Sequence, residues 1–136
     1  MNSAPGPLEG RLVPVGLALL GVYQLAQGLL MVLAPGTFYE LIGPFGPQND
    51  HYVRDTATYS LALGAVALVA VRRASWRVPV LVFAVAQFAL HSANHLLDID
   101  EADPAFLGPA DFVALLVSTV LLAVVLLAAG RGGAER

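Results

Sequence analysis

The three histidines of the chain stand near carboxylates, at spacings that bring side chains to one face of a helix. His51 and Asp55 are four residues apart, and so are His91 and His95. Side chains at that spacing are neighbours on a helix surface, so their imidazole and carboxylate groups can act on one ligand together. Imidazole nitrogens with a carboxylate suit Zn²⁺, Cu²⁺ or non-haem iron. These residues therefore predict a site for a divalent transition metal.

The predicted site combines both histidine-bearing segments. Its ligands are His51, Asp55, His91, His95 and Asp98. Its supporting polar side chains are Arg54, Asn94, Gln87 and Asp111. Either Asp55 or Asp98 could instead hold an imidazole N–H from outside the ligand shell. Such a metal would hold the protein together or act on a small or lipid-derived substrate.

The same residues fit two other roles. In the first, Arg54 pairs with Asp98 or Asp50, and the histidines form hydrogen bonds to nearby polar groups. The cluster then only holds helices together. The protein would be a non-catalytic accessory subunit that binds a protein partner. In the second, the histidines move protons for a small transporter, because imidazole changes charge near neutral pH. The half of each segment farther from its histidines is nearly all aliphatic, which favours a cavity open to the outside over a continuous channel. Whether the protein is an enzyme stays open.

Composition excludes several other classes of site. The chain has no cysteine, which excludes disulfides, thiolate zinc sites and iron–sulfur clusters. Its net charge of −3 gives no field that would attract nucleic acid. Facing histidines can ligate haem iron, but the aromatic residues do not mark out a pocket for the macrocycle, so haem is disfavoured.

The elements that must position these residues are membrane-spanning helices. Hydrophobic residues make up 57% of the 136 residues and charged residues only 12%, about half the charge of a soluble domain. A helix that crosses the bilayer needs about 20 mostly apolar residues. Four segments meet that length: 12–34, 51–71, 78–97 and 111–129. We therefore expect one all-α domain over residues 1–136, a four-helix transmembrane bundle.

Arginine placement predicts the orientation of this bundle. Four spans put the N-terminus, the 72–77 connection and the C-terminus on one side of the membrane. That side holds six of the seven arginines: Arg11, Arg72, Arg73, Arg77, Arg131 and Arg136. The positive-inside rule makes it cytoplasmic. The expected location is the bacterial cytoplasmic membrane, with lipid, a second copy or another membrane protein as partners. The N-terminal apolar run is too long for a secretory signal, so we expect it to be retained as a helix.

The connections carry further expectations. The short 72–77 turn makes the second and third spans antiparallel neighbours, which should turn their histidine-bearing sides toward each other. Residues 37–42 could form a short interfacial helix, since aromatic residues favour the headgroup level. Residues 99–110 are expected to be simply solvated. Pro79 should lie in the first turn of its helix, and Gly130 should end the last one. Four glycines are expected to permit close helix packing: Gly16, Gly21, Gly28 and Gly64.

The chain also resembles a group of small membrane proteins. The resemblance rests on Leu33-Ala34-Pro35, on Asn49 to Asp55 (NDHYVRD), and on Leu90 to Asp98 (LHSANHLLD). These motifs are similar to those of small four-helix membrane proteins of actinobacterial type, whose broad architecture is like that of the DoxX-like proteins. The resemblance covers about residues 12–129. It implies a four-helix bundle and brings no activity, cofactor or site residue with it.

Overall fold

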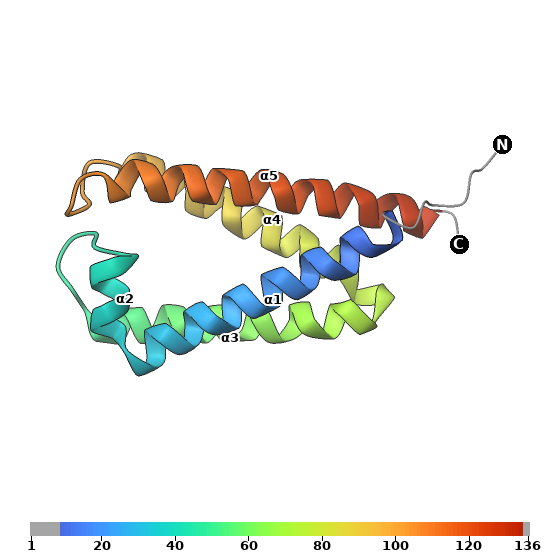
Figure 1. Cartoon of the computed structure of the whole chain (residues 1–136), viewed down its shortest axis with the longest axis horizontal. Helices are drawn as coiled ribbons and strands as arrows, with labels where there is room; N and C mark the ends of the chain where they lie inside the picture. Colours follow the sequence, from blue (N-terminus) through green and yellow to red (C-terminus); the bar gives the residue numbers. More distant parts are fainter. Residues whose placement is uncertain (1–8, 135–136) are drawn as a thin grey trace.

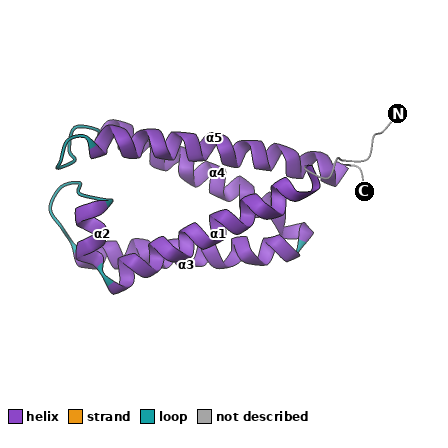
Figure 2. Ribbon diagram, in the orientation of Figure 1, coloured by secondary structure: helices purple, strands orange, loops and turns teal. Residues whose placement is uncertain are grey.

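A computed structural model describes residues 9–134, and these form an all-helical chain (Figure 2). The helices are α1 (Glu9–Leu33), α2 (Pro35–Leu41), α3 (Asp50–Arg72), α4 (Ala74–Leu97) and α5 (Leu107–Ala134). Five helices therefore replace the predicted four. The additional one is α2, close to the short helix expected at 37–42. The predicted domain also included residues 1–8 and 135–136, which lie outside the described part.

The long helices form two antiparallel pairs. α1 packs chiefly against α3, and α4 packs chiefly against α5. Only Arg73 separates α3 from α4, and the two pairs diverge from that point toward the opposite end of the molecule (Figure 1). We call the end near Arg73 the turn end. The other, which carries α2 and the segments 42–49 and 98–106, is the loop end.

Glycines explain why α1 and α3 lie so close. A Cβ atom added at Gly64 would lie 3.0 Å from the carbonyl oxygen of Gly21, and one added at Gly28 would lie 2.8 Å from Leu61. Similarly, a Cβ added at Gly16 would lie 2.9 Å from Val125 on α5. Small residues let helix backbones approach closely in this way. The predicted packing role of these glycines is confirmed.

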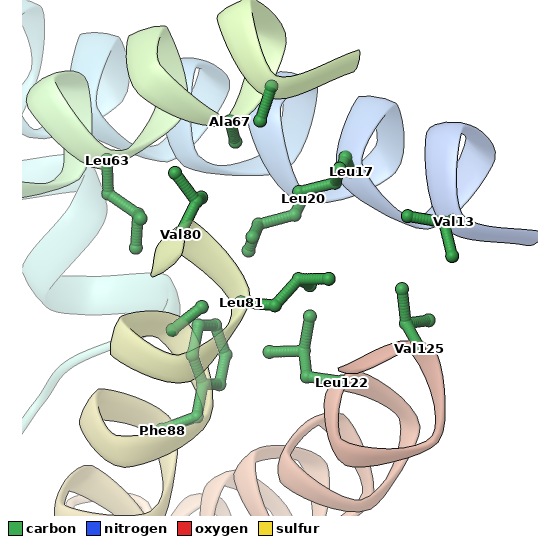
Figure 3. Packing of buried hydrophobic residues seen from close by; sticks show 12 residues of the cluster. Val13, Leu17, Leu20, Leu63, Ala67, Val80, Leu81, Phe88, Leu122 and Val125 are labelled. Atoms are coloured by element: carbon green, nitrogen blue, oxygen red, sulfur yellow. The ribbon is translucent and has the colours of Figure 1, made fainter. Parts of the chain in front are cut away.

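The apolar core occupies the half of the molecule nearest the turn end. Side chains from all four long helices meet there, and Leu17 and Leu81 are fully buried (Figure 3). Leu81 points between Leu20 of α1 and Leu122 of α5. At this level the two helix pairs are joined into one body, because each contributes side chains to the same cluster.

Among residues 9–134, three helical segments are long and apolar enough to cross a membrane: Gly10–Leu33, Ala74–Leu97 and Leu107–Arg131. They correspond to the first, third and fourth predicted spans. α3, which contains the predicted span 51–71, is not among them. Its first two turns carry Asp50, His51, Arg54 and Asp55, and these groups lower the mean hydropathy of the helix.

Helix ends differ from the predicted ones at the turn end. α4 begins at Ala74, so Pro79 lies in its second turn rather than its first. α5 continues through Gly130 to Ala134, so that glycine does not end the helix. Arg77 donates from Nη2 to the carbonyl oxygen of Val71 at 3.0 Å and so caps the end of α3. A cation there also complements the negative end of the helix dipole.

The two connections at the loop end touch each other. Phe45 and Ala102 form an isolated antiparallel bridge, and the Asp103 backbone N–H donates to the Pro44 carbonyl oxygen at 3.2 Å. Ala102 is buried, and α5 begins as early as Leu107. The expectation that 99–110 is simply solvated is therefore wrong: part of it closes the loop end, and part of it is helix.

Candidate functional site: a cavity at the loop end

A cavity of about 400 Å³ lies between the diverging helix pairs at the loop end. Each long helix lines it with residues three or four apart, which share one helical face. The residues of the first pair are Tyr23, Gln27 and Met31 of α1, with Tyr52, Val53 and Thr56 of α3. Those of the second pair are Phe88, His91 and His95 of α4, with Asp111, Ala114, Leu115 and Ser118 of α5. The cavity thus lies among four helices, not only between the second and third predicted spans.

Aromatic side chains close the cavity at two levels. Phe88 belongs both to the lining and to the buried core, so it separates the cavity from the turn end. Phe45, from the segment after α2, sets its ring edge-on to His95 with ring centroids 4.7 Å apart. The buried cluster between Phe88 and the turn end consists of hydrophobic side chains. That the cavity opens to one side of the membrane stays a prediction.

His91 and His95 form the polar centre of the α4 stripe. Their Nε2 atoms are 3.1 Å apart, which makes one nitrogen a donor and the other an acceptor. Both side chains are partly buried. His95 also presents Nδ1, a buried atom with no hydrogen-bond partner among the described residues. The pair therefore keeps unused hydrogen-bonding capacity at the cavity wall.

Asp111 supplies the one carboxylate that lines the cavity in the described part of the chain. It stands in the first turns of α5, within electrostatic range of His95 and Tyr23. Its Oδ2 atom is buried and, within residues 9–134, finds no hydrogen-bond partner. A buried polar atom without a partner costs free energy, so a ligand or water that bonds to it would be stabilised.

The two residues predicted as ligands on α3 lie away from this cavity. His51 and Asp55 pair with each other at 3.4 Å, and their side chains are 78% and 63% exposed. Arg54 pairs with Asp50 at 3.9 Å rather than with Asp98. The helix turns Tyr52 and Thr56 to the cavity instead, after Asn49 caps its first turn by accepting from the His51 and Tyr52 backbone N–H groups.

The predicted residues on α4 divide in the same way. His91 and His95 line the cavity, whereas Asn94 and Asp98 are exposed and bond to each other at 3.4 Å. Gln87 lies near the cavity but does not line it, and its Oε1 atom is buried without a partner among the residues described.

The five predicted ligands are therefore not assembled into one group. Within residues 9–134, no three His, Asp or Glu side chains lie together as a candidate metal-binding group. The cause is the packing: α3 pairs with α1 and α4 with α5, so the two histidine-bearing segments separate toward the loop end. The polar pairs that these residues form join side chains four positions apart, so none of these pairs links two helices in the described part of the chain.

The sequence argument missed the aromatic lining. Tyr23, Phe38, Tyr39, Phe45, Tyr52 and Phe88 line the cavity, six of the ten Phe and Tyr residues in the chain. The statement that aromatics mark out no pocket is thus wrong. The residue spacing could have indicated this lining. Tyr52 and Thr56 share one helical face, and Phe88, His91 and His95 share another, so each face combines aromatic and polar groups. His91 and His95 stand on the same helix, and the exclusion of haem stays a prediction.

Comparison of the chain with protein-family models, curated proteins and solved structures found no match. The functional argument therefore rests on the cavity itself.

Proposed function

We propose that this is a four-span protein of the bacterial cytoplasmic membrane that takes a small amphiphilic molecule from the bilayer into its loop-end cavity. The observation that carries the proposal is that a polar, aromatic cavity and an apolar groove share three lining residues, Tyr23, Phe88 and Ser118. The cavity of about 400 Å³ falls in the range of small-molecule sites, roughly 300–1,000 Å³.

Contact between the two loop-end segments supports four spans rather than three. The bridge between Phe45 and Ala102 holds segments 42–49 and 98–106 against each other, so both belong on the same side of the membrane. The chain between them contains α3 and α4. If α4 crosses, α3 must cross in the opposite direction to return the chain to that side.

Arginines support a cytoplasmic turn end. Within the described residues, Arg11, Arg72, Arg73, Arg77 and Arg131 stand toward that end, against Arg54 at the loop end. Arg136, which entered the predicted orientation, lies outside the described part.

Because the chain lacks cysteine, single cysteines at Gln48, Ser75 and Asp100 test both spans and orientation with a membrane-impermeant maleimide. Cysteines at 48 and 100 should react in intact spheroplasts, and the one at 75 only after permeabilisation. Opposite behaviour at 48 and 100 would contradict four spans.

An apolar groove of about 370 Å³ between α1 and α5 supports a lipid-like ligand. It shares Tyr23, Phe88 and Ser118 with the cavity and is otherwise lined by aliphatic residues and Gly16. From Tyr23 to Leu12 it follows α1 for about 16 Å at 1.5 Å per residue. A headgroup in the cavity would therefore let an alkyl chain of about 12 carbons lie along the groove.

Photolabelling tests this function directly. A dodecanol bearing a diazirine should label residues of the cavity and the groove when the protein is reconstituted in nanodiscs. Ala114→Trp fills the cavity wall and should strongly reduce labelling. Leu116→Trp, two residues along α5 and outside both hollows, is the matched control and should label normally. Labelling that is spread over the lipid-facing surface, or equal in both variants, would overturn the proposal.

A second candidate function is transition-metal binding by His91 and His95, for which their geometry gives a specific reason. Two imidazoles on a tetrahedral Zn²⁺, with Zn–N near 2.05 Å, place their nitrogens about 3.3 Å apart. The Nε2 atoms here are 3.1 Å apart. Elemental analysis of purified protein should then find stoichiometric zinc, copper or iron that is lost in His91→Ala/His95→Ala. Metal retained in that variant, or none in the unmodified protein, would contradict this candidate.

A further inference from the structure

We propose that the amphiphile carries a protonated amine as its headgroup, an inference that rests on the proposed function and narrows its ligand class. Three properties of the cavity lead to it: its aromatic walls, its unpartnered acceptors, and the charge around its mouth.

The walls combine aromatic side chains with one acid. Six Phe and Tyr side chains line the cavity with Asp111, and among the described lining residues there is neither lysine nor arginine. Aromatic faces attract cations through the ring quadrupole, most strongly where water is excluded. An anionic headgroup would instead meet the Asp111 carboxylate without a compensating cation. The lining therefore favours an ammonium over a phosphate or a carboxylate.

The unpartnered atoms in the wall match an N–H donor. Asp111 Oδ2 is buried with nothing to accept from, and His95 Nδ1 is buried without a partner in the described structure. When His95 donates its Nε2–H to His91, its Nδ1 becomes an acceptor. Both residues line the cavity, and small rotations of their side chains would let one ammonium group donate N–H bonds to both atoms. Charge-assisted bonds of this kind are stronger than neutral ones.

The charge at the loop end would draw a cation to the cavity. Eight carboxylates stand in this region, against Arg54 as its one arginine among the described residues: Glu40, Asp50, Asp55, Asp98, Asp100, Glu101, Asp103 and Asp111. A surface of one sign raises the local concentration of oppositely charged ligands and speeds their binding. On its own this surface would select any cation; the apolar groove restricts the choice to an amphiphilic one.

Competition against the diazirine photolabel tests the headgroup. The competitors are dodecylamine, dodecanol and dodecanoate, which share one chain length and differ in charge. Dodecylamine should compete at a concentration about tenfold or more below that of dodecanol, the difference expected for a charge-assisted hydrogen bond. Dodecanoate should be the weakest. Asp111→Asn should remove the advantage of the amine over dodecanol, whereas Asp98→Asn should leave that advantage unchanged.

Two results would overturn the inference. One is equal competition by amine and alcohol in the unmodified protein. The other is an amine advantage that persists in Asp111→Asn with correctly folded protein, as judged by an unchanged melting temperature. In either case specific labelling by dodecanol would still support an amphiphile site. Loss of specific labelling altogether would instead remove the proposed function, so the two failures are distinct.

Discussion

The two halves of this bundle are built from different residues and do different things. Toward the turn end, aliphatic side chains from all four long helices meet in one buried cluster. Toward the loop end, the same four helices are held apart by aromatic and polar side chains around a cavity. Phe88 belongs to both halves and marks their boundary. The same four helices thus form a packed core at one end and a cavity at the other.

Small residues determine where the helices can meet. Gly21 and Gly64 bring α1 and α3 into backbone contact, and Gly16 lets α5 approach α1 near the turn end. Farther along, α4 presents Phe88 and His91 and α5 presents Asp111, which are larger and polar. The pairs therefore separate where close packing would bury those groups without partners. Comparison of the two halves indicates that side-chain size and polarity along the helices determine where the cavity forms.

Truncating a leucine in the closed half should have the largest effect on stability. Leu81 is fully buried between α1 and α5. Leu81→Ala should lower the free energy of unfolding by about 2 kcal/mol, mainly through lost packing, because lipid solvates an unpacked leucine almost as well as a core does. Leu115→Ala, at the cavity wall and only partly buried against the core, should cost less. Thermal unfolding in detergent measures both, and equal losses would show that the halves do not differ in packing.

Adding a methyl group at the close contact between α1 and α3 should have the next largest effect on stability. Gly64→Ala places a Cβ 3.0 Å from the Gly21 carbonyl oxygen and 2.8 Å from Leu25. The α1–α3 pair must shift, which should cost about 1–3 kcal/mol, as overpacking does elsewhere. Gly130→Ala is the control, since a Cβ there meets nothing within 4 Å. Comparable melting temperatures for the two variants would contradict close packing as the role of Gly64.

The elements were predictable because their signals are local. An apolar run of membrane length identifies a helix whatever it packs against, so α1, α3, α4 and α5 were expected close to their observed bounds. α2 was also foreseen, through Phe38 and Tyr39 near a membrane surface. The same reasoning counted α3 as a span by length alone, although its charged first turns keep it out of the three apolar spans.

The site was only partly predictable because it depends on which helices pair. Consecutive helices α3 and α4 were assumed to face each other, and this joined His51 and Asp55 to His91 and His95. The glycines instead pair α1 with α3, and Tyr52 rather than His51 then lines the cavity. Asp111 was placed at the correct level, but only as a supporting residue. Helix pairing is long-range information that spacing within one helix does not contain.

Removing the α3 cap should affect the open half moderately. Asn49 accepts the His51 and Tyr52 backbone N–H groups at 3.1 and 3.3 Å. Asn49→Ala should destabilise the protein by about 1 kcal/mol and loosen the turn that carries Tyr52, so photolabelling of the cavity should fall as well. The neighbouring Gln48→Ala removes an exposed side-chain hydrogen bond to Asp50 and should change neither. If Asn49→Ala lowered the melting temperature without any loss of labelling, the cap would stabilise the protein but would not position the residues that line the cavity.

The smallest effect is expected from the residues that first suggested chemistry on α3. His51 and Asp55 form an exposed pair outside the cavity, and exposed pairs typically contribute less than about 1 kcal/mol. His51→Ala/Asp55→Asn should therefore leave stability, photolabelling and any bound metal almost unchanged, whereas His91→Ala/His95→Ala should alter the cavity. Measuring all three properties in both double variants compares the two histidine-bearing segments directly. If the α3 variant lost labelling or metal as fully as the α4 variant, the two segments would have to meet in the functional state, and the separation of α3 from α4 at the loop end would not describe that state.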